Sequence, residues 1–267
     1  MRLDRELVRR GLAPSREAAG DAIREGRVLV AGSVAAKPST LVSAADPVAL
    51  AGPARRWASR GGGKLAPVLE RLGVEVAGRR CLDAGASTGG FTDVLLRAGA
   101  AEVVAVDVGY GQLDLRLRQD PRVVVLDRTN VRDLDAERIG GPVDLTVADL
   151  SFISLRLVLP ALARVTRDGG DLVLLVKPQF EAGREAVGRG GVVRDPAARA
   201  AAVRAVAGTA ASLGLGLGVA GLCPSPLPGP AGNLELFLHL HAGAAPLDEA
   251  ALQAALAEGA TLPGAAS

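Results

Sequence analysis

Apolar and polar positions follow two different patterns along the chain, and these patterns alternate from residue 64 onwards. Short, nearly continuous apolar runs are typical of strands buried on both faces, whereas the segments between them repeat apolar positions with helical spacing. The runs predict strands at 79–84, 101–107, 122–127, 143–149, 170–176, 213–223 and 233–240. The intervening segments predict helices at 65–73, 90–98, 111–119, 154–166 and 195–212. The alternation predicts an α/β fold with a doubly wound, seven-stranded, mostly parallel sheet and helices on both faces.

The first 50 residues show the pattern of a small α+β unit. RLDRELVRRGL predicts a short amphipathic helix that Gly11 ends, and SREAAGDAIREG predicts a second helix between the N-cap Ser15 and Gly26. RVLVAG and a later VAL predict short strands. A segment rich in glycine, proline and arginine follows, in which we expect Trp57 to pin two domains together. We therefore predict a head at 1–50, a linker at 51–63, a main domain at 64–241 and a disordered tail at 242–267.

Composition and charge narrow the classes of function. The chain has 267 residues of which 49% are hydrophobic, so it can bury a sizeable core and is not a disordered chain. Aromatic residues make up only 2%, which makes ring-stacking platforms for single-stranded nucleic acid unlikely candidates. Residues 1–60 carry a net charge of +5 and the remainder −3. This asymmetry favours a basic head that meets a polyanion, although a solvated basic surface would give the same count.

Other segments argue against a membrane, secreted or metal-binding protein. No charge occurs between Arg204 and Glu235, but glycines and the segment PSPLPGP interrupt this stretch, so we do not predict a spanning helix. The charged start MRLDRELVRR does not resemble a signal peptide, and two cysteines lie in apolar runs, which indicates a cytoplasmic protein. His239 and His241 alternate near the end of a strand without metal-ligand spacing. We interpret them as residues of a strand edge and predict no metal site.

The head resembles a known RNA-binding domain. The run RLDRELVRRGLAPSREAAGDAIREGRVLVAG, followed by KPS, is similar to the S4 domain found in a ribosomal protein, in pseudouridine synthases and in TlyA-type methyltransferases. The resemblance implies a basic face that contacts folded RNA through phosphates, which position a substrate without reading its sequence. The residues implied are Arg5, Arg9, Arg16, Arg24, Arg27 and Lys37. For each arginine, a solvated helix face is the alternative.

A glycine-rich turn follows the first strand of the main domain, in RRCLDAGASTGGFTDVLL. Its glycines would let backbone amides approach a ligand at the start of the next helix. A dinucleotide fingerprint would need glycine where Ser87 stands, and the spacing instead resembles the S-adenosylmethionine loop of class I methyltransferases. The candidate cofactor residues of this turn are Asp83, Gly85, Ser87, Gly89, Gly90 and Phe91.

Polar residues at the ends of the next two strands extend this candidate cofactor site. Asp107 follows the glycine turn by about 20 positions, which suits hydrogen bonds to ribose hydroxyls. Asp127 and Asn130 end the third strand, where an adenine edge could be bound. Loop capping by these three side chains is the alternative. The TlyA-type methyltransferases more often have glutamate at the position of Asp127.

Four separated residues give a sharper prediction. Lys64 lies before the sheet, and Asp149 and Lys177 each lie at the end of a predicted strand. Glu235 lies on the last strand, near its start. In this order they resemble the catalytic residues of the FtsJ type of 2′-O-ribose methyltransferase. With the S4-like head and with DVGYGQLD, RTNVR, VADLSFISL, VKPQFEAGRE and GGVVRDP, residues 1–241 resemble the TlyA-type, or haemolysin A, family of rRNA methyltransferases.

The resemblance implies transfer of a methyl group from S-adenosylmethionine to the ribose 2′-oxygen of cytidine in 16S and/or 23S rRNA, on 30S and/or 50S subunits. No metal is required. Lys177 would deprotonate or orient the hydroxyl, Asp149 would hold Lys177, and Lys64 and Glu235 would complete the polar network. Only three of the 31 basic side chains are lysines, and two of them fall on these positions. Arginine could not replace a proton acceptor, because it stays protonated.

The loop FEAGREAVGRGGVVRDP adds further arginines among glycines. We expect a mobile basic lid over the RNA backbone, with a plain surface loop as the alternative, and we add Arg60, Arg184 and Arg189 to the RNA-binding candidates. Ala58 stands where the family has valine, which bears on how rigidly the linker couples the domains. Two other functions stay open, a membrane-active haemolysin and a non-catalytic ribosome-assembly factor. The oligomeric state also stays open, with a monomer as one candidate.

Overall fold

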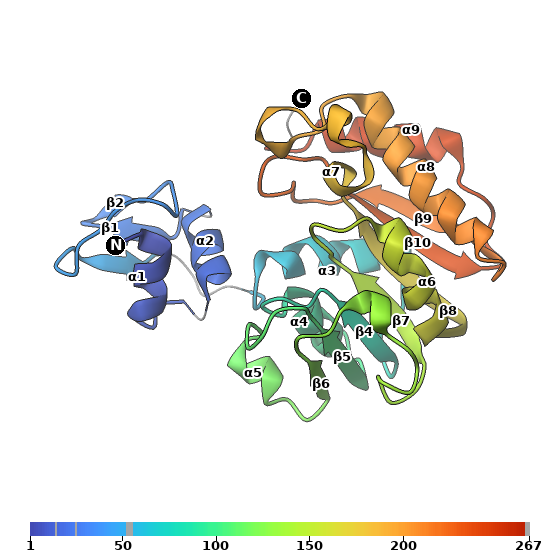
Figure 1. Ribbon diagram of the computed structural model, residues 1–267, viewed down its shortest axis with the longest axis horizontal. Coiled ribbons are helices and arrows are strands. Elements are labelled where there is room, and N and C mark those ends of the chain that lie inside the picture. The colour runs from blue at the N-terminus through green and yellow to red at the C-terminus, as the bar shows by residue number, and fades with distance from the viewer. Residues whose placement is uncertain (14, 25, 52–55, 265–267) are drawn as a thin grey trace.

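The computed structural model describes residues 1–13, 15–24, 26–51 and 56–264. They form two units, which Figure 1 shows as a small blue body that holds the N-terminus and a larger body built around a sheet. No helix among these residues is long and apolar enough to cross a membrane.

The head has the two helices and the small sheet that its pattern predicts. Its core is filled by buried apolar side chains, among them Leu3, Leu7, Ile23 and Val28. Its strands pair antiparallel in the order β2-β1-β3. Its elements are α1 (Leu3–Arg9), α2 (Arg16–Arg24), β1 (Val28–Val30), β2 (Ser33–Val34) and β3 (Val48–Leu50).

The seven predicted strands of the main domain form one sheet, so the predicted fold class is confirmed. The sheet has the order β6-β5-β4-β7-β8-β10-β9, and β10 alone runs antiparallel to its neighbours β8 and β9. The apolar runs predict this arrangement because strands covered on both faces need apolar side chains on both. The strands are β4 (Arg80–Ala84), β5 (Glu102–Val106), β6 (Val123–Leu126), β7 (Val143–Ala148), β8 (Thr166–Val176), β9 (Leu217–Pro224) and β10 (Leu236–Ala242).

Helices cover both faces of this sheet and enclose two apolar cores (Figure 1). One face is covered by α3 (Arg60–Leu72), α4 (Gly90–Arg97) and α5 (Leu115–Arg118). The other is covered by α6 (Leu155–Val165), α8 (Pro196–Ser212) and α9 (Glu249–Ala260). The short helix α7 (Pro178–Glu181) follows β8, and 3-10 turns lie at Val131–Asp133, Arg184–Ala186 and Arg189–Gly191.

The strand order places a ligand site between β4 and β7. From β4 the chain adds β5 and β6 on one side, then crosses to β7 and continues on the other side. In open α/β sheets, ligands bind outside the carboxyl ends of the strands at such a switch point. The glycine turn follows β4 and Asp149 follows β7, so both lie at this point.

The boundary between head and main domain differs from the predicted linker at 51–63. Residues 52–55 lie outside the described part of the chain, and α3 already begins at Arg60. The helix starts early because the hydroxyl of Ser59 caps it, accepting a hydrogen bond from the amide of Gly61 at 3.3 Å. A Cβ on Gly62 would lie 2.5 Å from Trp57, so the glycine run lets the helix pack on this ring. Arg97 of α4 covers the ring from 4.9 Å, which fixes Trp57 to the main domain.

The prediction of a disordered tail at 242–267 is wrong for residues 249–260, which form α9. Asp248 caps this helix by accepting from the amide of Ala250 at 2.9 Å, and Leu252 and Leu256 are buried in the core beneath α8 and β9. The alanines between these leucines obscured the helical spacing of a buried face. Residues 265–267 lie outside the described part of the chain.

Candidate active site

The carboxyl ends of β4, β5, β7 and β8 surround a cavity of about 510 Å³. Its walls come from the segments that follow these strands, at 85–88, 107–108 and 149–153, and from Lys177. The start of α3 adds Ser59, Arg60, Gly61 and Lys64. This volume is within the range of small-molecule sites, about 300–1,000 Å³. The predicted cofactor loop and three of the four predicted catalytic residues therefore share one cavity.

The glycine turn after β4 is built for close packing. Gly85 and Gly89 have φ angles of 89° and 93°, which favour glycine. A Cβ on Gly85 would lie 2.7 Å from the carbonyl oxygen of Asp149, and one on Gly90 would overlap the hydroxyl of Ser59. Gly85, Ser87, Gly90 and Phe91 line the cavity, whereas Gly89 shapes the turn without lining it.

Asp107 is fixed by the turn and keeps capacity for a ligand. Its Oδ2 accepts from the amide of Ser87 at 2.9 Å and its Oδ1 from the amide of Gly109 at 2.6 Å. Each carboxylate oxygen can accept a second hydrogen bond, so Asp107 can still bind ribose hydroxyls.

The two candidates after β6 are placed differently. Asn130 lines the cavity, although its side-chain oxygen also accepts from the amide of Arg132 at 3.0 Å. Asp127 is absent from the cavity lining among the described residues. Its carboxylate accepts from Arg118 at 2.5 Å and from the amide of Gly111 at 3.2 Å, which fits the loop-capping alternative.

Asp83 lies beneath the turn and is fully buried. Burial raises the pKa of this carboxyl group to about 7, although Thr92 donates a hydrogen bond to its Oδ2 at 2.6 Å. Its Oδ1 has no hydrogen-bond partner among the described atoms. Asp83 does not line the cavity, so it contributes by holding the turn from beneath through Thr92.

Lys177 and Asp149 form an ion pair at the cavity wall. Because β7 and β8 are parallel neighbours, residues that follow their carboxyl ends come together. Lys177 Nζ lies 2.6 Å from Asp149 Oδ1 and donates to the hydroxyl of Ser151 at 2.9 Å. Burial alone would raise the pKa of Asp149, but the charges of Lys177 and Lys64 lower it below its ordinary value. These contacts take two of the three hydrogen-bonding directions of the ammonium and leave one for a ligand.

Lys64 and Glu235 form a second buried pair. Lys64 Nζ lies 2.6 Å from Glu235 Oε2, and Gln179 donates to Glu235 Oε1 at 3.3 Å. Glu235 is buried behind Lys64 and does not line the cavity, among the residues that the structure describes. Glu235 therefore acts on the cavity through Lys64.

Sequence reasoning missed two residues of this wall, Ser151 and Phe152. Ser151 accepts from Lys177, and Phe152 lines the cavity with 92% of its surface exposed and a φ of 65°. The ring of Phe180 contacts it with centroids 5.3 Å apart. An aromatic side chain held in water in a strained conformation is a candidate contact for a nucleobase. The only sequence signal is position, since both residues closely follow Asp149.

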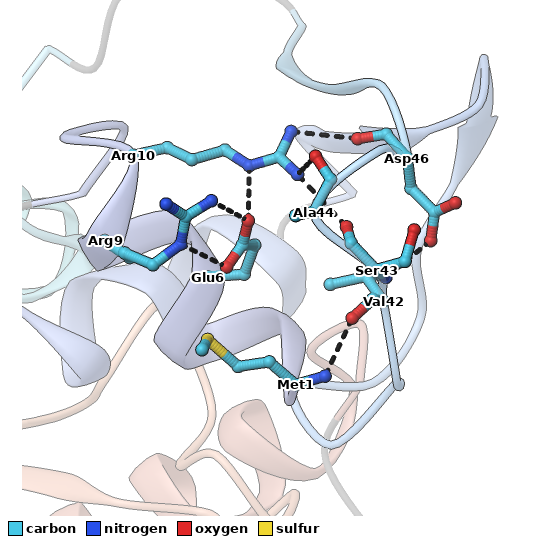
Figure 2. A network of polar contacts seen from close by, with 8 residues as sticks. All are labelled: Met1, Glu6, Arg9, Arg10, Val42, Ser43, Ala44 and Asp46. Atoms are coloured by element: carbon cyan, nitrogen blue, oxygen red, sulfur yellow. Dashed lines mark hydrogen bonds and ion pairs between the residues drawn. The ribbon is translucent and has the colours of Figure 1, made fainter.

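Buried acids hold the predicted basic residues of the head. Glu6, whose pKa the guanidinium groups of Arg9 and Arg10 lower to about 2, bonds both side chains (Figure 2). Arg10 turns inward and donates to the carbonyls of Ser43, Ala44 and Asp46, so its role is structural. Arg9 stays half exposed and keeps donors for RNA.

The other basic candidates of the head are also at its surface. Asp4 pairs with Arg16 at 3.0 Å, and Asp21 pairs with Arg24 at 2.6 Å. Asp21 and Arg24 line the same cavity as Lys177. Arg5 and Lys37 are exposed and Arg27 is half buried. Fixed guanidinium groups lose less conformational freedom when a phosphate binds.

The remaining basic candidates lie on the main domain. Arg60 lines the cavity and donates to the carbonyl of Pro228. Arg189 is exposed on a 3-10 turn, and the side chain of Arg184 lies outside the described part of the chain. The described residues contain no group of three or more His, Cys, Asp or Glu side chains able to hold a metal ion.

Two family profiles match the chain. The profile of the FtsJ-like methyltransferases matches residues 57–242, and that of the S4 domain matches residues 1–48. The structure of a Streptococcus thermophilus protein solved under a hemolysin name aligns with a TM-score of 0.77 and 38% identity. That alignment covers 97% of this chain and 95% of the other.

Several relatives match about 90% of the chain. The 16S/23S rRNA (cytidine-2′-O)-methyltransferase TlyA of Mycobacterium tuberculosis is 58% identical over 90% of this chain and 89% of its own length. Hemolysin A of Brachyspira hyodysenteriae is 36% identical over 90% of this chain and 99% of its own length. The profiles, these identities and the geometry of the cavity agree, and the chain belongs to the FtsJ-like methyltransferase family with an S4 domain at its N-terminus.

Proposed function

We propose that the chain transfers the methyl group of S-adenosylmethionine to the ribose 2′-oxygen of cytidine in 16S and/or 23S rRNA. The observation that carries the proposal is the Lys177–Asp149 pair, which shares one cavity with the glycine turn and Asp107. The relative at 58% identity bears the name of this activity. Because rRNA is the substrate, we place the reaction in the cytoplasm.

The residues of the cavity fit the proposed cofactor. Asp107 and Asn130 would bind its nucleoside, and the glycine turn would accommodate its amino-acid part, while Asp83 would support this turn from beneath. When bound, S-adenosylmethionine supplies a methyl group on a positively charged sulfur, which makes the methyl carbon an electrophile. The acceptor would then meet the remaining residues of the cavity wall, which are Lys177, Asp149, Ser151 and Phe152.

Lys177 would act on the ribose hydroxyl. The 2′-hydroxyl would occupy the hydrogen-bonding direction of Nζ that Asp149 and Ser151 leave open. The methyl group would pass to this oxygen with its former bonding electron pair left on sulfur, and the hydroxyl proton would pass to water that the ammonium orients. Nζ itself could take the proton only from a Lys177 that has first lost one, because the ammonium has no free electron pair. Holding both reactants in line contributes much of the acceleration, because it replaces a bimolecular encounter.

The head and the basic residues near the cavity would hold the RNA. The exposed guanidinium groups of Arg9, Arg16 and Arg24 are fixed by buried acids, which suits repeated phosphate contacts. Arg60 and Arg189 would extend these contacts toward the acceptor. We propose that folded rRNA in a 30S or 50S particle is bound across both units.

The proposal is tested with radiolabelled S-adenosylmethionine and unmodified 30S and 50S particles, with naked rRNA as a parallel substrate. Digestion to nucleosides should place the label in 2′-O-methylcytidine. Lys177→Ala serves as the matched enzyme control, because it should bind the cofactor and transfer no label. Label on a base, label on protein alone, or equal labelling by the variant would contradict the proposal.

A further inference from the structure

The segment that follows β8, residues 177–181, contacts both the loop after β7 and Glu235 before β10. Lys177 pairs with Asp149, Gln179 bonds Glu235, and Phe180 contacts Phe152. The last residue, Glu181, is 8% exposed, and neither the predicted catalytic set nor the cavity lining includes it. A buried carboxylate needs partners, so its contacts show what it holds.

Glu181 bonds the start of α6 with both carboxylate oxygens. Oε1 accepts from the amide of Leu155 at 2.6 Å, and Oε2 accepts from the hydroxyl of Ser154 at 2.6 Å. Arg156 approaches Oε2 at 3.4 Å. A carboxylate at a helix N-terminus satisfies a free amide and interacts favourably with the helix dipole.

These bonds tie together the two segments that carry the catalytic pair. Residues 149–154 run from the end of β7 to the start of α6 and carry Asp149, Ser151 and Phe152. The segment with Lys177 and Glu181 leaves the neighbouring strand β8. The Lys177–Asp149 ion pair holds the first residue of the 149–154 loop against the segment after β8, and the bond from Ser154 to Glu181 holds its last residue against the same segment.

We infer that Glu181 is a positioning residue for methyl transfer, which holds the 149–154 loop so that Asp149 and Ser151 meet Lys177. This inference rests on the proposed function. Glu181 contacts neither the cavity nor the cofactor turn, so its loss should misalign the catalytic pair and leave both substrates bound. Alignment within a few tenths of an ångström matters for such groups.

The first test separates kcat from binding. In Glu181→Ala, kcat should fall about 30-fold, while KM for rRNA and Kd for S-adenosylmethionine change less than about twofold. Glu181→Gln should keep kcat within about threefold, because the amide oxygen still accepts from Leu155 and the amide group can donate to the Ser154 hydroxyl. Ser154→Ala, which removes one of the two bonds, should fall between them.

A second test does not depend on activity. The chain has only three lysines, so an amine-modifying reagent followed by mass spectrometry reports each one separately. Lys37 is exposed and serves as the internal reference, and Lys64 is buried. In Glu181→Ala, the modification rate of Lys177 relative to Lys37 should rise about tenfold while Lys64 stays protected, because only the partners of Lys177 become mobile.

Asp248→Ala is the matched control, since it also removes a helix N-cap but at α9, away from the cavity. It should lower Tm slightly and leave kcat and Lys177 modification unchanged. If Glu181→Ala does not fold, Glu181→Asp and Ser154→Ala decide the question, because the shorter carboxylate cannot reach both partners.

The inference is overturned if kcat and Lys177 modification stay at wild-type values in the folded variants. It is also overturned if cofactor binding falls as much as kcat, or if Asp248→Ala behaves in the same way. Failure of the proposed function would show differently, as a wild-type protein that yields no 2′-O-methylcytidine.

Discussion

Strands β8 and β10 carry a charged cluster toward each end, and the two clusters serve different purposes. At the carboxyl end of β8, Lys177 pairs with Asp149, and Glu235 before β10 pairs with Lys64. Further along the same strands, Asp171 accepts from His239 at 2.7 Å, from His241 at 3.0 Å and from Arg79 at 2.5 Å.

The clusters differ in what their donors face. Three members of the first line a cavity and retain hydrogen-bonding directions for a ligand, whereas none of the second lines that cavity. Burial opposes ionisation of Asp171, but His239 and Arg79 outweigh it and hold the pKa well below its ordinary value. The second cluster faces no part of this cavity, so we expect it to stabilise the fold, whereas the first leaves hydrogen-bonding directions open in the cavity and is suited to chemistry. Substitutions should therefore separate activity from stability.

The largest effect is expected for Lys177→Arg, which keeps the charge but removes a group able to accept a proton. We expect kcat to fall by about 100-fold or more, because general-base catalysis contributes about 10²–10⁴. Single-turnover transfer to rRNA measures this, with cofactor Kd and Tm as controls that should stay near wild type. Near-normal transfer would leave Lys177 with positioning alone.

Asp171→Asn should do the opposite and cost stability. Breaking a buried charge cluster costs about 3 kcal/mol of unfolding free energy, measured by urea unfolding at pH 7. Below its Tm the variant should transfer methyl groups at the wild-type rate. A fall in kcat without loss of stability would mean that the two clusters are coupled through β8.

The stabilisation by Asp171 should also depend on pH with a defined sign. Because its folded pKa is depressed, the contribution is fully present above the unfolded value of about 3.9 and is lost as pH falls through the folded pKa. The stability difference between wild type and Asp171→Asn should therefore shrink as pH falls below about 4.

The sequence predicted the fold well because its signals are local. Each strand of the main domain is a short apolar run bounded by glycine, proline or charged residues, so its place can be predicted without knowing its neighbours. The helix α9 was not predicted because it is rich in alanine, with few large apolar side chains to mark a buried face. Only the structure shows that Leu252 and Leu256 belong to the same core as Leu234.

The sequence predicted which residues belong to the candidate site, but it did not predict which of them contact one another. Strand ends located Asp107, Asp149 and Lys177, because parallel strands bring their carboxyl ends together. The sequence did not show what Ser151 and Glu181 contact, since their contacts depend on register and on the length of the loop between β7 and α6. The interpretation of His239 and His241 as residues of a strand edge is wrong for His239, which is buried at the middle of β10 between β8 and β9. Its bond to Asp171 depends on the pairing of β10 with β8, which the sequence does not show.

The smallest effect is expected for His241→Ala. Its side chain is 40% exposed and its bond to Asp171 is the longer of the two histidine bonds, so its loss should cost about 0.5–1 kcal/mol. Unfolding of the single variants and of His241→Ala combined with Asp171→Asn forms a double-mutant cycle. The second substitution should cost less in the Asp171→Asn background, because the partner is already lost. A decrease in kcat in His241→Ala would contradict the division, since it would show that a residue facing only the structural cluster acts on the chemistry at the other end of the strands.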